Sequence, residues 1–331
     1  MVRRAVALAL ALVACSPHLD DRLFRVEGPR ILAVVAEPAE AAPGTPIAYR
    51  ALQVDASGEI TDAIDWAFCA ERAPLASLGS VSANCLHASG DAIVPFGAMT
   101  IDAAGALPVD ACRLFGPEVP PAGQPGDPPG RPVDPDPTGG YYQPLRLIPE
   151  AGGEVGVTIE RTRIQCGLAS GTGEDRVAYL HRYRVNRNPS LSMLDLAMPN
   201  GTHVTIDTSA PPAPSQIPAG TVVTIRASWT ECPGHVDDLP MDACAGAEPY
   251  LVYDGITEAL VERRETMRLA WFATAGTIAS DRTGREATDA TTFSENTWTA
   301  PDTAGPVSLW IVLRDDRGGV GWFRIDLVVT I

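Results

Sequence analysis

The chain of 331 residues, 45% of them hydrophobic, is long enough for two packed domains, and extensive disorder is not expected. Its formal net charge of −16 repels phosphate backbones, so we expect no nucleic-acid partner. All 25 basic residues are arginine, which codon usage explains and selection for bidentate pairing with carboxylates would also explain.

The first residues have the form of a bacterial export signal. Met1–Arg4 is basic, and Ala5–Ala14 is an apolar run too short to span a bilayer. The run ends at Leu12–Cys15, which resembles the bacterial lipobox. The resemblance implies a signal peptide at 1–14, lipidation of Cys15 and a tether at 15–28, and the serine that follows the cysteine implies outer-membrane sorting. An ordinary signal peptide with an incidental cysteine is the alternative.

Six further cysteines fit an oxidising compartment. An even number predicts three disulfides, and six cysteines can pair in fifteen different ways. No pair has the CxxC spacing of a zinc site, so we expect no structural zinc. We expect Cys232 to pair with Cys244 across a short acidic loop. The six are Cys69, Cys85, Cys112, Cys166, Cys232 and Cys244.

Alternating apolar residues predict strands in the first half of the chain. Ile31–Ala36, Ile47–Val54 and Ile64–Phe68 have this pattern, and Trp66 is expected in the core. Residues 117–137 contain nine prolines and cannot form a helix or an interior strand. This stretch is interpreted as a surface loop, which a Cys112–Cys166 disulfide would close, and a stiff domain linker is the alternative.

Later alternation at 155–159 and 177–185 predicts the last strands of a first domain, with a boundary near 187. The second domain then carries an insertion at 230–265 that contains two cysteines. The end of this insertion, 257–268, fits a short helix or a strand.

The last third has the clearest strand pattern. Met267, Leu269 and Trp271 share one face of a strand, and alternate residues of 307–313 and 323–331 share faces of two more. Between these two strands, Asp315–Gly319 has the composition of a turn.

An internal repeat relates the two halves. Gly44–Ala51 aligns with Gly220–Ala227, each after a nearby proline and before a strand with a tryptophan, Trp66 or Trp271. Two copies of one sandwich module explain this pattern.

The second copy resembles the bacterial immunoglobulin-like and PKD-like repeats. The resemblance rests on Gly220–Trp229, Leu269–Phe272, Asn296–Pro301 and Val307–Val329, and it is weaker at 29–70. It implies an all-β chain of two tandem immunoglobulin-like β-sandwich domains with long loop insertions. The domains would span 29–187 and 188–331.

Motifs of catalysis and of tight metal binding are absent from the sequence. It contains no HExxH, GxSxG, Walker or strand-linked GxGxxG motif, so no enzyme and no cofactor are expected. A divergent hydrolase using paired acids of the insertion is the alternative. Those acids are Asp237, Asp238, Asp242 and the acids of 258–265.

The five histidines are scattered, and nothing local predicts a Ser-His-Asp site. They are His18, His87, His181, His203 and His235. Asp134–Gly139 begins like an EF-hand loop, but Leu145 occupies the position that needs a bidentate glutamate. A looser calcium site there or at Asp315-Asp316 stays open, with an acidic turn as the alternative.

Four aromatic residues are candidates for a contact surface. Tyr141 and Tyr142 follow a flexible loop, and Trp310 and Trp322 lie opposite the inward faces of their strands. Core covering and domain-interface packing are the alternatives.

The sequence therefore predicts a non-catalytic cell-envelope lipoprotein that acts as an interaction or scaffolding module. Its membrane contact is the lipid anchor, and its protein or glycan partner is unknown. A carbohydrate-binding or adhesive surface protein is the second hypothesis.

Overall fold

The computed structural model describes residues 22–79, 81–87, 89–118, 125–127, 129–130, 136–150, 156–168, 170–209, 214–240 and 244–331. Strands dominate these residues, which confirms the predicted all-β class of two immunoglobulin-like sandwiches. The lipobox, Cys15 and most of the proline-rich stretch lie outside them. None of the described helices is both long and apolar enough to cross a membrane.

The first sandwich is built from strands between Arg30 and Ile164. One sheet has the order β1-β3-β4, with β7 also paired to β3, and the other has the order β2-β9-β8-β5-β6. Trp66 is fully buried between the sheets beside Tyr49, as expected of a core residue. The strands are β1 (Arg30–Glu37), β2 (Glu40–Ala41), β3 (Pro46–Asp55), β4 (Gly58–Glu59), β5 (Ile64–Cys69), β6 (Ile93–Met99), β7 (Asp102–Ala106), β8 (Tyr141–Pro149) and β9 (Thr158–Ile164).

The second sandwich pairs two five-stranded sheets, with the orders β11-β10-β13-β19-β17 and β12-β21-β20-β16-β18. Met267, Leu269 and Trp271 of β16 all face its core, as their alternation predicted. A separate hairpin, β14-β15, extends from it. The strands are β10 (Leu191–Ala197), β11 (His203–Asp207), β12 (Ser215–Pro218), β13 (Val222–Trp229), β14 (Pro249–Asp254), β15 (Ala259–Arg264), β16 (Met267–Ala273), β17 (Thr277–Ile278), β18 (Arg282–Arg285), β19 (Phe293–Thr299), β20 (Gly305–Arg314) and β21 (Val320–Thr330).

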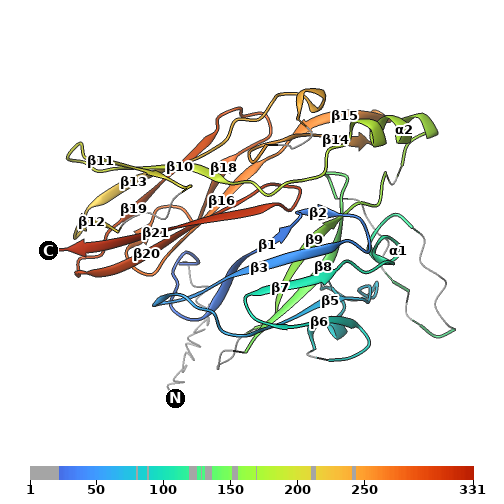
Figure 1. Ribbon diagram of the computed structural model, residues 1–331, viewed down its shortest axis with the longest axis horizontal. Helices are drawn as coiled ribbons and strands as arrows, with labels where there is room; N and C mark the ends of the chain where they lie inside the picture. The colour runs from blue at the N-terminus through green and yellow to red at the C-terminus, as the bar shows by residue number, and fades with distance from the viewer. Residues whose placement is uncertain are drawn as a thin grey trace, which may run out of the picture.

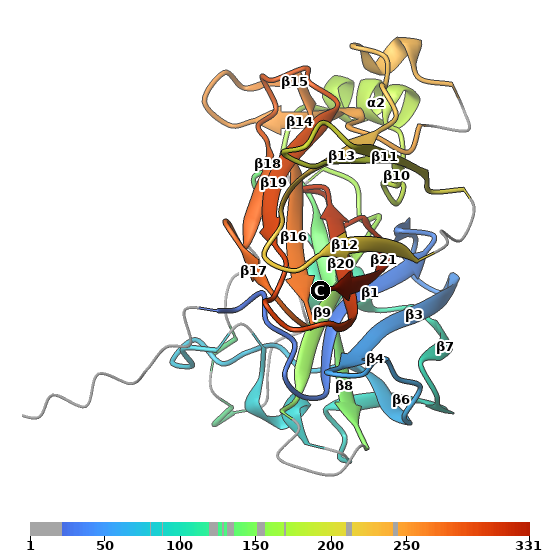
Figure 2. The same ribbon diagram turned by 90° about the vertical axis from the view of Figure 1, so that its left-hand side faces the viewer.

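A third apolar layer joins the two sandwiches. Strand β20 is buried on both faces: Leu309 and Ile311 face the second core, while Trp310 and Val312 face the first sandwich. There they pack with Leu32 and other residues of β1 and β3. The two sandwiches therefore lie directly against each other, with β1 beside β21 (Figures 1 and 2).

The internal repeat occupies equivalent places in the two sandwiches. Gly44 and Gly220 have φ of 81° and 68°, a backbone region that glycine adopts without strain. A long strand begins two residues after each of them, β3 in the first sandwich and β13 in the second.

Two local predictions in the middle of the chain differ from the structure. Residues 177–185, predicted as a strand, belong largely to helix α2 (Gly173–Arg182). Thr172 and Asp175 form a capping box that begins this helix, and such a cap outweighs a short alternation. The helix alternative at 257–268 is also wrong, because β15 and the start of β16 occupy it. The remaining helical pieces are α1 (Ala111–Phe115), η1 (Ala83–Leu86) and η2 (Val236–Asp238).

The end of the predicted tether is part of the folded unit. Phe24 and Val26 are buried, and the backbone of 24–26 exchanges hydrogen bonds with Ala273 of β16, at 2.9 and 3.0 Å. The tether prediction for 15–28 is therefore wrong from Phe24 onward, because apolar side chains there cover the joint between the sandwiches.

The linker between the two sandwiches, residues 173–190, is packed against both halves of the chain. Helix α2 precedes the predicted boundary at 187/188, yet its Tyr179 packs on Val236 and Leu251 of the second half. The proline-rich stretch lies between β7 and β8 of the first sandwich, and a Cys112–Cys166 disulfide joins its flanks.

Candidate functional site

A buried arginine joins the second sandwich to the segment that connects the two sandwiches. Arg317 belongs to the β20–β21 turn at Asp315–Gly319 and is fully buried. Its Nε donates to Glu265 Oε1 at 2.7 Å, and its Nη2 donates to Glu248 Oε2 at 3.1 Å. Nη2 also donates to Asn186 Oδ1 at 3.0 Å. The guanidinium thus connects the last hairpin, the cysteine-bracketed insertion and the linker.

The linker extends this network into the first sandwich. The backbone N–H of Asn186 donates to Glu40 Oε2 at 2.8 Å, and the Tyr183 hydroxyl donates to the same carboxylate at 2.6 Å. Arg163 Nε of β9 lies 3.3 Å from Glu40 Oε2. Arg163 also donates to the Tyr142 hydroxyl at 3.0 Å. Both sandwiches are therefore joined by charge-assisted contacts that are shielded from water.

Acids outnumber arginines in this buried network. Burial raises the pKa of Glu248 to about 7, although Arg317 opposes the shift. The pKa values of Glu265 and Asp315 are likewise raised by burial, and that of Asp316 is raised to about 6. Desolvation disfavours the charged carboxylates more strongly than the arginines favour them. The network therefore takes up protons when the protein folds.

This proton uptake predicts higher stability in weak acid than at neutral pH. The contribution of Glu248 is fully present below its unfolded pKa of 4.5 and is lost as the pH rises through about 7. We expect a higher Tm at pH 5.5 than at pH 7.5, measured by calorimetry. Glu248→Gln should flatten this dependence, whereas Glu295→Gln, which removes an exposed carboxylate, should retain it. Equal pH slopes for wild type and Glu248→Gln would contradict the assignment.

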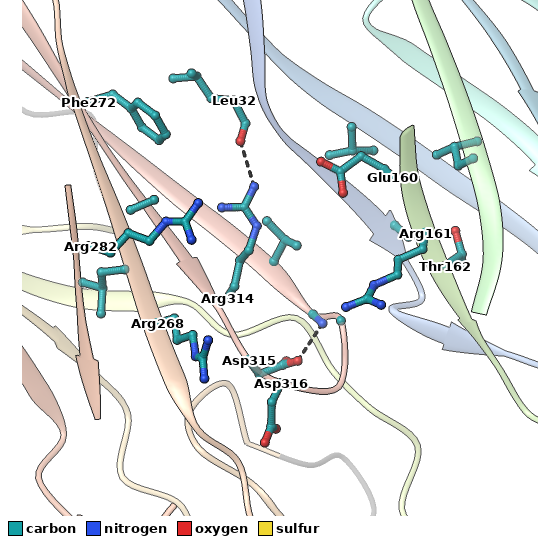
Figure 3. Close-up of a pocket in the computed structure, with 18 of the residues that line it drawn as sticks. Leu32, Glu160, Arg161, Thr162, Arg268, Phe272, Arg282, Arg314, Asp315 and Asp316 are labelled. Carbon is teal, nitrogen blue, oxygen red and sulfur yellow. Dashed lines mark hydrogen bonds between the residues drawn. The ribbon is translucent and has the colours of Figure 1, made fainter. Parts of the chain in front are cut away.

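Beside the network, a cleft of about 700 Å³ opens between the sandwiches (Figure 3). Its walls come from β1 and β9 of the first sandwich and from β16, β18 and β20 of the second. Five arginines and five acids line it, and its lining among the described residues contains no His, Cys or Ser. The arginines are Arg30, Arg161, Arg268, Arg282 and Arg314, and the acids are Asp136, Glu160, Asp281, Asp315 and Asp316.

Two of the four aromatic residues proposed for a contact surface are buried. Trp310 is fully buried between the sandwiches, where its Nε1 donates to Glu59 Oε1 at 3.3 Å. Trp322 is half-buried in the same layer. Tyr141 is buried in the first core, and Tyr142 is half-buried, with Arg161 over its ring at 4.6 Å. The interpretation as an outward surface is therefore wrong for Trp310 and Tyr141, because a second sheet covers each of them.

The acids proposed for a hydrolase lie in several places, and two of them, Asp237 and Glu262, lie together at the Arg182 guanidinium. Glu265 is bound to Arg317, and Asp237 accepts from Arg182 at 2.9 Å. Glu258 is exposed at a turn. Asp242 lies outside the described residues. Asp237 and Glu262 therefore share one arginine, and both carboxylates are engaged in ion pairs.

The described histidines lie on the surface, and the Nδ1 of one of them, His235, lies 3.2 Å from Glu262 Oε2. His87, His181, His203 and His235 are exposed, and His18 lies outside the described residues. Within the part of the chain that is described, no group of three or more His, Cys, Asp or Glu could hold a metal ion. Asp134 is not described, and Asp136 accepts from the N–H and hydroxyl of Thr138, as in an acidic turn.

The six cysteines of the folded part form three disulfides. The predicted pair Cys232–Cys244 forms, Cys69 pairs with Cys85, and Cys112 pairs with Cys166, the bond that would close the proline-rich loop. The backbone N–H of Cys244 donates to Glu248 Oε1 at 3.1 Å, so the last disulfide helps to position a ligand of Arg317. Disulfides persist in oxidising compartments, which fits an exported protein.

Sequence reasoning missed the ionic network and the cleft arginines. Glu40, Asn186 and Arg317 are far apart in the chain, and no local pattern relates them. Arg268 and Arg314 did carry a signal, because each is a charge at the outward position of an apolar strand. An outward charge is ordinary on a sheet face that is open to solvent. It indicates a site only when another sheet covers that face.

No protein-family model matches this chain, and no curated protein does. Three solved structures are similar over most of its length: the adhesin InvE of Yersinia pseudotuberculosis, the alpha-2-macroglobulin of E. coli and the latent dimeric PorU of Porphyromonas gingivalis. Their identities are 10%, 9% and 10%, and their TM-scores are 0.21, 0.24 and 0.19. The matches cover 89%, 91% and 92% of this chain but only 58%, 17% and 34% of the others. TM-scores this low carry no argument about function.

Proposed function

We propose that this protein is a non-catalytic lipoprotein of the bacterial envelope, anchored through Cys15, whose two sandwiches act as one rigid interaction or scaffolding module. The observation that carries the proposal is the joint between the sandwiches. An apolar layer and a buried ionic network connect them on adjacent sides, centred on Trp310 and Arg317. Tandem domains that only decorate a flexible stalk do not need such a joint.

Export and anchoring are supported by two independent features. The three disulfides fit an oxidising compartment. The lipobox-like Leu12–Cys15 stands at the end of an apolar run, where a lipid-modified cysteine would begin the mature chain. More than one acyl chain on Cys15 would provide stable anchoring, since a single chain is marginal.

Replacing the proposed lipid attachment site should release the protein. For Cys15→Ala, we expect loss of palmitate labelling and a shift from the membrane fraction to the soluble fraction of lysed cells. Ser16→Ala, one residue further on, should keep both the label and the membrane association. Membrane fractionation and labelling of Cys15→Ala at the wild-type level would overturn the anchor.

A further inference from the structure

Three arginines stand side by side on one face of the sheet that faces the cleft. Arg268 of β16 is directly opposite Arg314 of β20 in the antiparallel register. Arg282 of β18 is opposite Ala270, two residues along β16 from Arg268, and so projects from the same face. Figure 3 shows these three side chains on one wall of the cleft. Adjacent strands are about 4.8 Å apart, so the three form a short row of positive charge.

This row is electrostatically unfavourable for the protein alone. Like charges directly opposite on neighbouring strands destabilise a sheet. Among the described residues, none of the three has a carboxylate within 4.0 Å. Arg314 is half-buried and donates to the Leu32 carbonyl at 2.8 Å. Burial lowers its pKa, an effect that the Glu160 carboxylate opposes and Arg282 reinforces. In a chain with 41 acids, a row of three arginines without a described carboxylate at salt-bridge distance is a local concentration of positive charge suited to an anionic ligand.

The rest of the cleft indicates the chemistry of that ligand. Arg161 reaches into it from β9 on the opposite wall (Figure 3). Phe272 provides an apolar patch on the wall with the arginines. Glu160 and Asp316 also line the cleft, and Asp316 Oδ1 is buried without a hydrogen-bond partner. These two carboxylates offer acceptors for hydroxyl groups, while the arginine forks offer donors for oxyanions.

We infer that the cleft binds a small acidic carbohydrate, with carboxylate or phosphate groups on the row of Arg268, Arg282 and Arg314 and with hydroxyl groups toward Asp316 and Glu160. The volume of about 700 Å³ suits a ligand of two or three sugar rings. The net charge of −16 disfavours long polyanions, which would extend over the acidic surface. This inference rests on the proposed interaction role and names its ligand class, but it does not depend on the lipid anchor.

The test measures binding to the full exported chain, purified in detergent, by isothermal titration calorimetry at low salt. The probes are trigalacturonate, which carries carboxylates, glucose 1,6-bisphosphate, which carries phosphates, and maltotriose as a neutral control. We expect one of the two anionic sugars to bind and maltotriose not to bind. Which of them binds identifies the anionic group.

Two variants locate the site. Arg268→Gln and Arg282→Gln alter exposed side chains, and each should weaken binding about tenfold, because each removes a charge-assisted contact. The matched control Arg226→Gln removes an exposed arginine from the other sheet of the second sandwich and should bind like wild type. In the absence of ligand, Arg268→Gln should have an equal or higher Tm, since a like-charge contact is relieved.

Several results would overturn the inference. They are no binding of either acidic sugar up to millimolar concentration, equal binding of maltotriose, or unchanged affinity in Arg268→Gln and Arg282→Gln. Membrane release by Cys15→Ala is a separate measurement, so failure here and failure of the proposed anchor are distinguishable.

Discussion

Arg317→Met should lower the free energy of unfolding by about 3–5 kcal/mol, the range for breaking a buried ion pair by removing one partner. The guanidinium donates hydrogen bonds to both Glu265 and Glu248, and it also donates to the Asn186 side chain and to the Arg184 carbonyl. Its removal leaves two buried carboxylates without their positive partner, and methionine fills the volume without replacing a donor. Chemical denaturation at pH 7.5 measures this loss.

Two further variants make the Arg317 prediction specific. Arg226→Met breaks an exposed pair with Glu295 and should cost no more than about 1 kcal/mol. Adding Glu265→Gln to Arg317→Met should recover part of the loss, because it replaces a buried acid that has lost its donor with a neutral amide. A denaturation midpoint of Arg317→Met equal to that of wild type would contradict the role assigned to the network.

Trp310→Ala should also cost about 3–5 kcal/mol, as truncation of large buried aromatic residues does. Trp310 is fully buried in the layer between the sandwiches, with Leu32, Leu52 and Val312 among its neighbours. Because this layer couples the two sandwiches, its loss should separate their unfolding. We expect a second transition in differential scanning calorimetry in addition to the lower Tm.

The neighbouring Trp322 offers a matched control for this prediction. It belongs to the same layer but is only half-buried, so Trp322→Ala should cost less and keep a single transition. If Trp310→Ala unfolds in one transition at the wild-type Tm, the layer does not couple the sandwiches. The proposed rigid module would then lose its main support.

The strands of the second sandwich were largely predictable because each has one face in its own core. Met267, Leu269 and Trp271 of β16 follow the period of two that a half-buried strand imposes. In β20 the odd-numbered residues Leu309 and Ile311 were likewise assigned inward, and they are. Such local periodicity is a property of contiguous residues, so the sequence displays it directly.

The second face of β20 was not predictable in the same way. Trp310 and Val312 are apolar at outward positions, which fits an exposed patch and a domain interface equally well. Only the position of β1 and β3 against this face decides between them. Helix α2 is a comparable case, since a capping box at Thr172 outweighed the alternation that suggested a strand.

The placement of the charged groups depends most strongly on tertiary contacts. Asn186 lies 146 residues from Glu40 and 131 residues from Arg317, yet it donates to one and accepts from the other. Arg161 belongs to the first sandwich and the row of Arg268, Arg282 and Arg314 to the second, and only packing places them around one cleft. Within its own strand, each of these arginines resembles an ordinary surface charge.

The sequence by itself determined the all-β class, the module used twice and the even set of cysteines in the folded part, because these follow from local periodicity, repetition and counting. The tertiary structure alone decided that β20 is buried on both sides, that Arg317 is a buried centre of charge, and that three arginines of neighbouring strands face one cleft. These features depend on how two sandwiches pack, and packing joins residues whose separation in the chain no local pattern can bridge.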